Sequence, residues 1–271
     1  MNKIEEGEAE VDGVLINYAK AGRGPLFVLC LHGALGSWRT DFAEALARMD
    51  GERFTLVGWD APGYGRSRPP DRDFSSHANA DDARRADLLM QARTRPDLNK
   101  LELTPYSALG WSDGGVTALH VASQQTLGRS QRLQRLVVWG CSSYLTQAQI
   151  DAYELVKDPT KWSEESRRPY VDLYGEEYLQ WALESHIRAK TEVYDKQAGD
   201  KCKTILADVR QPTLVLHGGR DIFTPREHPE YFRATLPHVR VLYKEDAGHD
   251  LHKKHFDWFK TAVEAFLSES G

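Results

Sequence analysis

The chain has 271 residues and a formal net charge of −5. This balance gives no electrostatic reason to expect a nucleic acid partner. No apolar run approaches the roughly 18 residues that a membrane-spanning helix needs, and the three cysteines show no metal-ligand spacing. The acidic N-terminus has neither a secretory nor a transit signature, so the cytoplasm is the expected location.

Apolar runs alternate with segments of helical periodicity along most of the chain. An edge hairpin is expected over residues 11–20. The predicted buried strands follow at 26–31, 54–59, 105–110, 133–139, 212–217 and 239–243. The predicted helices lie at 40–49, 78–93, 116–122 and 255–267, with a polar loop at 94–100. This alternation implies an α/β fold with a mostly parallel central sheet and helices on both faces.

One segment, residues 142–208, interrupts the alternation because it contains no convincing strand. Charged, aromatic helical pieces are expected at 147–156, 163–173 and 176–190. An insertion after the carboxyl end of a strand lies over the place where open α/β sheets bind ligands. We therefore predict a helical lid at 142–208 on a core formed by 1–141 and 209–271. The alternative is a solvated helical decoration without a role.

The sequence Gly110-Trp111-Ser112-Asp113-Gly114 fits G-x-S-x-G, the turn that presents a serine nucleophile between a strand and a helix of an α/β-hydrolase sheet. The flanking positions must be small, because a Cβ atom there would collide with the neighbouring strand or helix. A predicted strand precedes the motif and a predicted helix follows it, which is the context that the motif requires. Ser112 is therefore the candidate nucleophile.

A serine hydroxyl needs a base that takes its proton and an acid that orients the base. In this fold the three residues follow one another in the order serine, acid, histidine. Asp221 comes shortly after the predicted strand 212–217, and His249 comes shortly after the strand 239–243. Both would therefore lie at the same sheet edge as Ser112, and they are the predicted acid and base.

Other residues fit these two roles less well. Asp246 and Asp250 are too close to His249 in sequence to orient its ring easily, and Asp60 precedes the serine in a segment typical of a structural turn. Acidic partners at ligand spacing are missing around the C-terminal histidines, so no metal site is predicted. The histidines expected to have no role as base or metal ligand are His32, His217, His252 and His255.

An oxyanion hole needs two N–H groups aimed at the negative charge that develops on the carbonyl oxygen. The expected donors are the backbone N–H groups of Asp113 and Ala34. A carboxylate on Asp113 beside this charge is unfavourable unless its side chain points away or has a cationic partner. A substrate ammonium would be such a partner. The alternative is an aspartate satisfied by a hydrogen bond within the protein, and the residues alone leave both open.

Taken together, these segments resemble the valacyclovir hydrolase (biphenyl hydrolase-like) family of α/β-hydrolases over nearly the whole chain. The resemblance is densest at residues 58–74 and 109–119, and it extends to the lid at 161–169 and 174–175. It implies a catalytic triad of Ser112, Asp221 and His249, and a role for Asp113 in binding the α-ammonium group of a substrate. It also implies a monomer without a cofactor, and a mitochondrial location if a targeting segment is missing.

The chain departs from this family at 94–104, 140–144 and 193–203, which help to line the acyl and leaving-group pockets. The preferred acyl side chain and alcohol are therefore not predicted. The expected function is that of a serine esterase that cleaves α-amino acid esters with a free amino group through an acyl-enzyme. The alternatives are a general carboxylesterase or lactonase, a carbon–carbon bond hydrolase on the same fold, and a non-catalytic ligand receptor.

Overall fold

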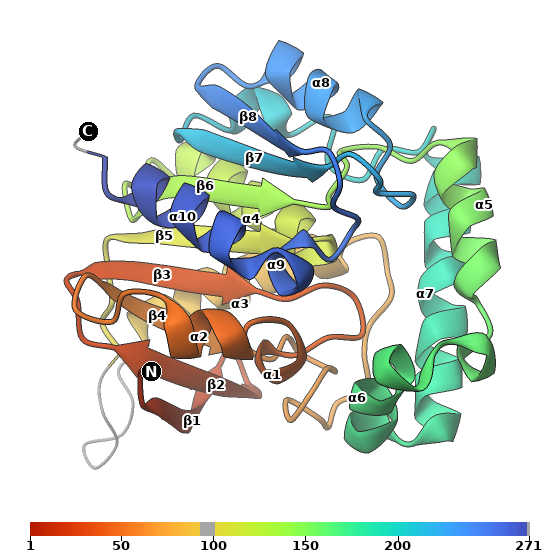
Figure 1. The fold of residues 1–271 in the computed structure, drawn as a ribbon, viewed down its shortest axis with the longest axis horizontal. Helices are drawn as coiled ribbons and strands as arrows, with labels where there is room; N and C mark the ends of the chain where they lie inside the picture. Colours follow the sequence, from red (N-terminus) through yellow and green to blue (C-terminus); the bar gives the residue numbers. More distant parts are fainter. Residues whose placement is uncertain (93–100, 270–271) are drawn as a thin grey trace.

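The strands form one eight-stranded sheet in the computed structural model, which describes residues 1–92 and 101–269 (Figure 1). Their order across the sheet is β1-β2-β4-β3-β5-β6-β7-β8. The pairs β1/β2 and β2/β4 are antiparallel and the other pairs are parallel, so the predicted fold class is confirmed. The strands are β1 (Ile4–Val11), β2 (Val14–Gly22), β3 (Leu26–Leu31), β4 (Phe54–Trp59), β5 (Tyr106–Trp111), β6 (Leu133–Trp139), β7 (Thr213–Gly218) and β8 (Val239–Lys244).

The central strands are covered on both faces, as their continuous apolar runs require. Every residue of β4 and β7 is buried. One core lies between the sheet and α1, α2 and α10, and a second lies between the sheet and α3, α4 and α8. The helices are α1 (Trp38–Asp41), α2 (Ala43–Arg48), α3 (Ala78–Gln91), α4 (Asp113–Leu127), α5 (Gln147–Val156), α6 (Glu164–Tyr174), α7 (Glu176–Lys196), α8 (Glu227–Thr235), α9 (Leu251–Lys254) and α10 (Phe256–Leu267).

Several element boundaries differ from those predicted. The edge hairpin consists of β1 and β2, and its turn lies at Asp12-Gly13, where φ is 52° and 76°. The helix expected at 40–49 is two short helices, because Phe42, with φ −124° and ψ 1°, ends the first one. Helix α7 extends beyond its predicted end, and α8 has no counterpart in the prediction. The polar loop expected at 94–100 lies outside the described residues.

Helices α5, α6 and α7 form a separate layer beyond the carboxyl ends of the parallel strands (Figure 1). The long helix α7 buries Leu179, Ala182 and Leu183 in the same core as α3 and α4. Neither α7 nor any other helix in the described parts of the chain is long and apolar enough to cross a membrane. The segment 142–208 thus lies where a lid over the sheet edge would lie, and its action as a lid stays a prediction.

Candidate active site

Ser112 lies in the tight turn between β5 and α4. Its backbone angles, φ 55° and ψ −120°, are in a region that residues with a side chain rarely adopt. The neighbouring glycines are required sterically. A Cβ atom on Gly110 would lie 2.5 Å from the carbonyl oxygen of Gly114, and one on Gly114 would lie 2.0 Å from that of Leu31. The Ser112 N–H donates to the carbonyl of Trp139 at 2.9 Å, which fixes the turn on β6.

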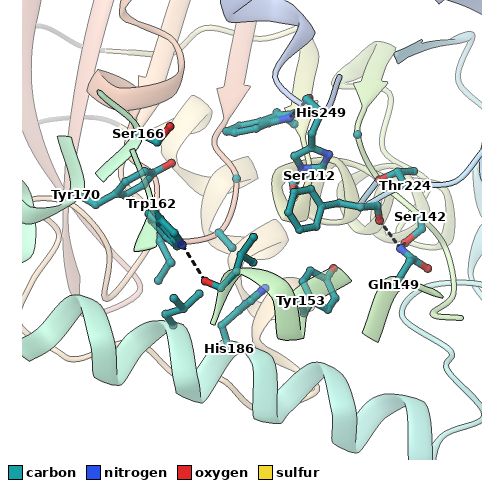
Figure 2. Close-up of a pocket in the computed structure, with 18 of the residues that line it drawn as sticks. Ser112, Ser142, Gln149, Tyr153, Trp162, Ser166, Tyr170, His186, Thr224 and His249 are labelled. Atoms are coloured by element: carbon teal, nitrogen blue, oxygen red, sulfur yellow. Dashed lines mark hydrogen bonds between the residues drawn. The ribbon is translucent and has the colours of Figure 1, made fainter. Parts of the chain in front are cut away.

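The three residues predicted as nucleophile, base and acid form a hydrogen-bonded row. The Ser112 Oγ lies 3.2 Å from Nε2 of His249, and both side chains are labelled in Figure 2. On the other side of the ring, His249 Nδ1 lies 2.9 Å from Oδ2 of Asp221. With the carboxylate ionised, Nδ1 carries the proton and Nε2 is free to accept the proton of the serine hydroxyl. The structure therefore brings the three side chains together in the arrangement that a base-activated serine needs.

Three further hydrogen bonds fix the acid and the base. The Asp221 side chain is only 1% exposed, and its Oδ1 accepts the N–H groups of Phe223 and Thr224 at 2.9 Å. The indole of Trp111 donates to the carbonyl of His249 at 2.9 Å. Sequence reasoning did not identify these supporting groups. The position of Trp111 beside the nucleophile, and the tendency of aspartate to accept N–H groups two residues ahead, were the available signals.

Five of the other residues considered from the sequence have structural partners. Asp60 accepts the N–H groups of Trp38 and Arg66 at 2.9 and 2.8 Å, so it organises the turn after β4. His32 Nε2 accepts the N–H of Ala61 at 2.9 Å. Within residues 1–92 and 101–269, no three potential metal ligands come together. The other three of these five pair as follows: Asp246 with Lys244, Asp250 with Lys254, and His252 with the Trp139 indole.

The two predicted oxyanion donors lie next to Ser112. Asp113 is the first residue of α4, where N–H groups lack a partner within the helix and the helix dipole is positive. Ala34 lines the same cavity as Ser112. The loop that carries Ala34 is held by the N–H of Gly33, which donates to Oδ2 of the buried Asp41 at 3.1 Å. This placement suits an oxyanion hole, and the role of the two N–H groups stays a prediction.

Ser112 opens into a cavity of about 410 Å³ between the sheet edge and helices α5, α6 and α7 (Figure 2). Apolar and aromatic side chains form much of its wall, which suits the body of a small-molecule substrate. Gly140, Ser142 and Lys201 also line it, and they belong to segments that depart from the resembled family. The large apolar and aromatic side chains of the wall are Leu35, Trp111, Tyr153, Val156, Trp162, Tyr170, Leu183 and Phe223.

The Asp113 carboxylate, predicted to hold a substrate ammonium, has cationic partners within the protein. Lys190 Nζ lies 2.9 Å from Oδ1 and 3.0 Å from Oδ2, and Lys201 Nζ lies 3.6 Å from Oδ1. Burial alone would raise the pKa of this carboxyl, but Lys190, then His186 and Lys201, outweigh burial and hold the pKa well below its usual range. Of the two kinds of partner that the sequence left open, the structure shows ammonium groups of the protein.

We call Asp113, His186, Lys190 and Lys201 the Asp113 cluster. Burial lowers the pKa of Lys190 to about 8 and that of His186 to about 3. Burial also opposes the charge of Lys201, but Tyr153 and Asp113 outweigh it and raise the pKa of Lys201 above its ordinary value. Near pH 7 the cluster therefore holds one negative and two positive charges. The i,i+4 spacing of His186 and Lys190 on one helix face was its only sequence signal.

A nucleophile turn, a histidine and a buried aspartate on this sheet define a protein of the serine hydrolase class. The sequence model of the alpha/beta hydrolase family matches residues 28–262. The chain therefore belongs to the alpha/beta hydrolase family. It is 36% identical to serine hydrolase BPHL from Mus musculus and 35% identical to serine hydrolase BPHL from Homo sapiens, in each case over 97% of this chain and 87% of the relative.

Solved structures show the same fold at lower sequence identity. The 2-hydroxy-6-oxo-6-phenylhexa-2,4-dienoate hydrolase from Rhodococcus sp. strain RHA1 has a TM-score of 0.78 at 16% identity, with 99% of this chain and 100% of that chain covered. A serine hydrolase involved in carbazole degradation has a TM-score of 0.75 at 20% identity, with 98% and 99% covered. At these identities the likeness concerns the fold alone.

Proposed function

We propose that the protein is a carboxylic ester hydrolase that works through an acyl-enzyme on Ser112. The observation that carries this proposal is the row Ser112–His249–Asp221, placed at a strained turn that opens into the cavity. The homology to the two serine hydrolases named BPHL supports it.

In the proposed reaction, His249 Nε2 takes the hydroxyl proton as Ser112 Oγ attacks the ester carbonyl carbon. The N–H groups of Ala34 and Asp113 stabilise the negative charge on the carbonyl oxygen. His249 then protonates the alcohol oxygen as the carbon–oxygen bond breaks, which leaves an ester of Ser112. Water, deprotonated by His249, attacks this ester and releases the acid. Asp221 holds the imidazole in the required tautomer throughout.

The direct test is the variant Ser112→Ala, with Ser166→Ala as its matched control, because Ser166 lines the same cavity without contacting His249. We expect Ser112→Ala to lose esterase activity to near the background rate and Ser166→Ala to retain it. A fluorophosphonate should inactivate the wild type and label the peptide that contains Ser112. Ester hydrolysis that persists in Ser112→Ala would show that Ser112 is not the nucleophile.

The finer candidate function is a preference for α-amino acid esters with a free amino group, which the Trp111-Ser112-Asp113 resemblance favours. In this structure a substrate ammonium would have to replace Lys190 at the Asp113 carboxylate. The test is to compare a valine ester with its N-acetyl counterpart. A roughly 10-fold or larger advantage in kcat/KM for the free amine would support this preference, since a charged hydrogen bond contributes about 1.5–3 kcal/mol. Equal rates would leave a general ester hydrolase.

A further inference from the structure

We infer that the substrate carries an anionic group, of the carboxylate kind, which binds the ammonium of Lys201 in the cavity beside Ser112. This inference rests on the ester hydrolase function proposed above and names its substrate class. It also reverses the sign of the charge that the resemblance implies for the substrate.

The ammonium groups of the Asp113 cluster outnumber its carboxylates. Its single carboxylate faces two ammonium groups. Lys190 takes both oxygens in hydrogen bonds at 2.9 and 3.0 Å, whereas Lys201 stays at 3.6 Å and donates no hydrogen bond from Nζ to any described residue. The nearby guanidinium of Arg72 does not change this count, because it pairs with the buried Asp82 at 2.7 Å. The ammonium of Lys201 therefore shares a carboxylate whose hydrogen bonds Lys190 already takes, and it has that carboxylate only at ion-pair distance.

Lys201 faces the cavity in which Ser112 lies. Lys201 lines both the cavity that contains Ser112 and His249 and the smaller neighbouring cavity, whereas Asp113 and Lys190 line the smaller one and are not among the residues that line the first. A ligand beside Ser112 thus meets the ammonium and not the carboxylate. Tyr153, labelled in Figure 2, lines the same cavity, and among the described residues its hydroxyl has no hydrogen-bond partner either. The wall therefore presents two open hydrogen-bond donors to the substrate.

Lys201 is built into the cavity wall and is not an exposed surface lysine. Its side chain is 6% exposed. Its backbone is anchored, since the N–H groups of Lys201 and Cys202 both donate to the carbonyl of Ser143, at 3.1 and 2.9 Å. Burying an ammonium without a hydrogen-bonded partner is unfavourable. An anionic substrate group would supply that partner. A neutral analogue would leave the ammonium unpaired, and a binding site discriminates strongly against a ligand that leaves a buried polar group unpaired.

The test compares kcat/KM for two matched pairs of esters, each corrected for its uncatalysed rate. Monomethyl and dimethyl glutarate place the charge in the acyl part, and 4-acetoxybenzoate and 4-tolyl acetate place it in the alcohol part. We expect the wild type to prefer the anionic member of at least one pair by about 10- to 100-fold. The variant Lys201→Met should lose that preference, measured as the ratio of kcat/KM between the anionic and the neutral member of the pair. Lys201→Arg should restore most of the preference.

Matched controls separate charge recognition from folding. Lys201→Met leaves Asp113 paired with Lys190, and Lys196→Met removes a lysine of α7 that is 71% exposed and should change neither rate. Equal rates for anionic and neutral esters, or a preference retained in Lys201→Met, would overturn the inference and leave the ester hydrolase standing. If no ester is hydrolysed, the proposed function fails. Calorimetric binding of glutarate to the protein then still tests the site, and affinity that is the same in Lys201→Met overturns it.

Discussion

The two sides of Ser112 differ in how their charges are matched. On one side, Asp221 and His249 form a closed row in which each polar atom has a defined partner. On the other side, the Asp113 cluster holds two ammonium groups for one carboxylate. The first arrangement is complete without a ligand, as pre-organised chemistry requires. The Asp113 cluster places an ammonium group without a hydrogen-bonded partner on the cavity wall, and such a group can bind a charged ligand.

The two sides also come from different parts of the fold. Asp221 and His249 follow β7 and β8 of the sheet, whereas Lys190 and Lys201 lie on α7 and in the segment after it. We infer from this comparison that the sheet edge sets the reaction and that the segment 142–208 sets the charge of the substrate. The following changes test this division, from the largest expected effect to the smallest.

The largest effect should come from His249→Gln, which removes the base and keeps a polar side chain of similar size. We expect kcat for every ester to fall by about 10⁴-fold or more, because the serine hydroxyl then has no proton acceptor. The ratio between anionic and neutral esters should stay near the wild-type ratio. Steady-state kinetics on both ester pairs measures these two quantities separately. A loss below roughly 100-fold would show that His249 is not the base.

A smaller effect, on stability, should come from Asp113→Asn. The substitution leaves the buried Lys190 and Lys201 side by side without a negative charge. Removing one partner of a buried ion pair costs about 3–5 kcal/mol, which for a chain of this size lowers Tm by on the order of 10 °C. Asp195→Asn, an exposed change on α7, is the control. Calorimetry that finds equal Tm values for the two variants would contradict a charge-paired cluster.

The smallest effect concerns the pH dependence of stability. Burial lowers the pKa of Lys190 to about 8 in the folded protein from an ordinary value of 10.5. Between these pH values the unfolded chain binds more protons than the folded one, so stability rises with pH in this window. The destabilisation caused by burying the charged Lys190 is fully present below about pH 8, and it disappears as the pH approaches 10.5.

Lys190→Met lacks this titration and provides the reference. Between about pH 8 and pH 9.5, the free energy of unfolding of the wild type should rise by on the order of 1–2 kcal/mol relative to that of Lys190→Met. Urea unfolding of both proteins across this range measures the difference. If the difference in free energy of unfolding between the two proteins does not change with pH, Lys190 keeps an ordinary pKa and its burial does not lower that pKa.

The sheet edge was predictable because of how parallel sheets are built. The carboxyl ends of parallel strands meet at one edge, so residues after β5, β7 and β8 had to lie near one another. Ser112, Asp221 and His249 were found from that rule and from their order in the chain. The steric need for glycine at Gly110 and Gly114 was likewise local and readable.

The Asp113 cluster was not predictable in the same way. Lys190 is 77 residues from Asp113 in sequence, and their contact depends on how α7 packs over the sheet. A charged residue on a helix is usually read as part of a solvated face, and nothing in the spacing marks Lys190 or Lys201 as buried. The role of Asp113 was therefore open between substrate and protein, and packing of the lid segment decided which partner it has in this structure.

The central claim, an acyl-enzyme on Ser112, is tested most directly by partitioning between water and an added alcohol. Esters that share one acyl group but carry different leaving alcohols are hydrolysed in the presence of methanol, and the ratio of methyl ester to free acid is measured. Our account predicts the same ratio for all of them, because every ester passes through the same acylated Ser112 before methanol or water attacks. A ratio that changes with the leaving alcohol would show that water attacks the substrate directly, and the acyl-enzyme would have to be abandoned.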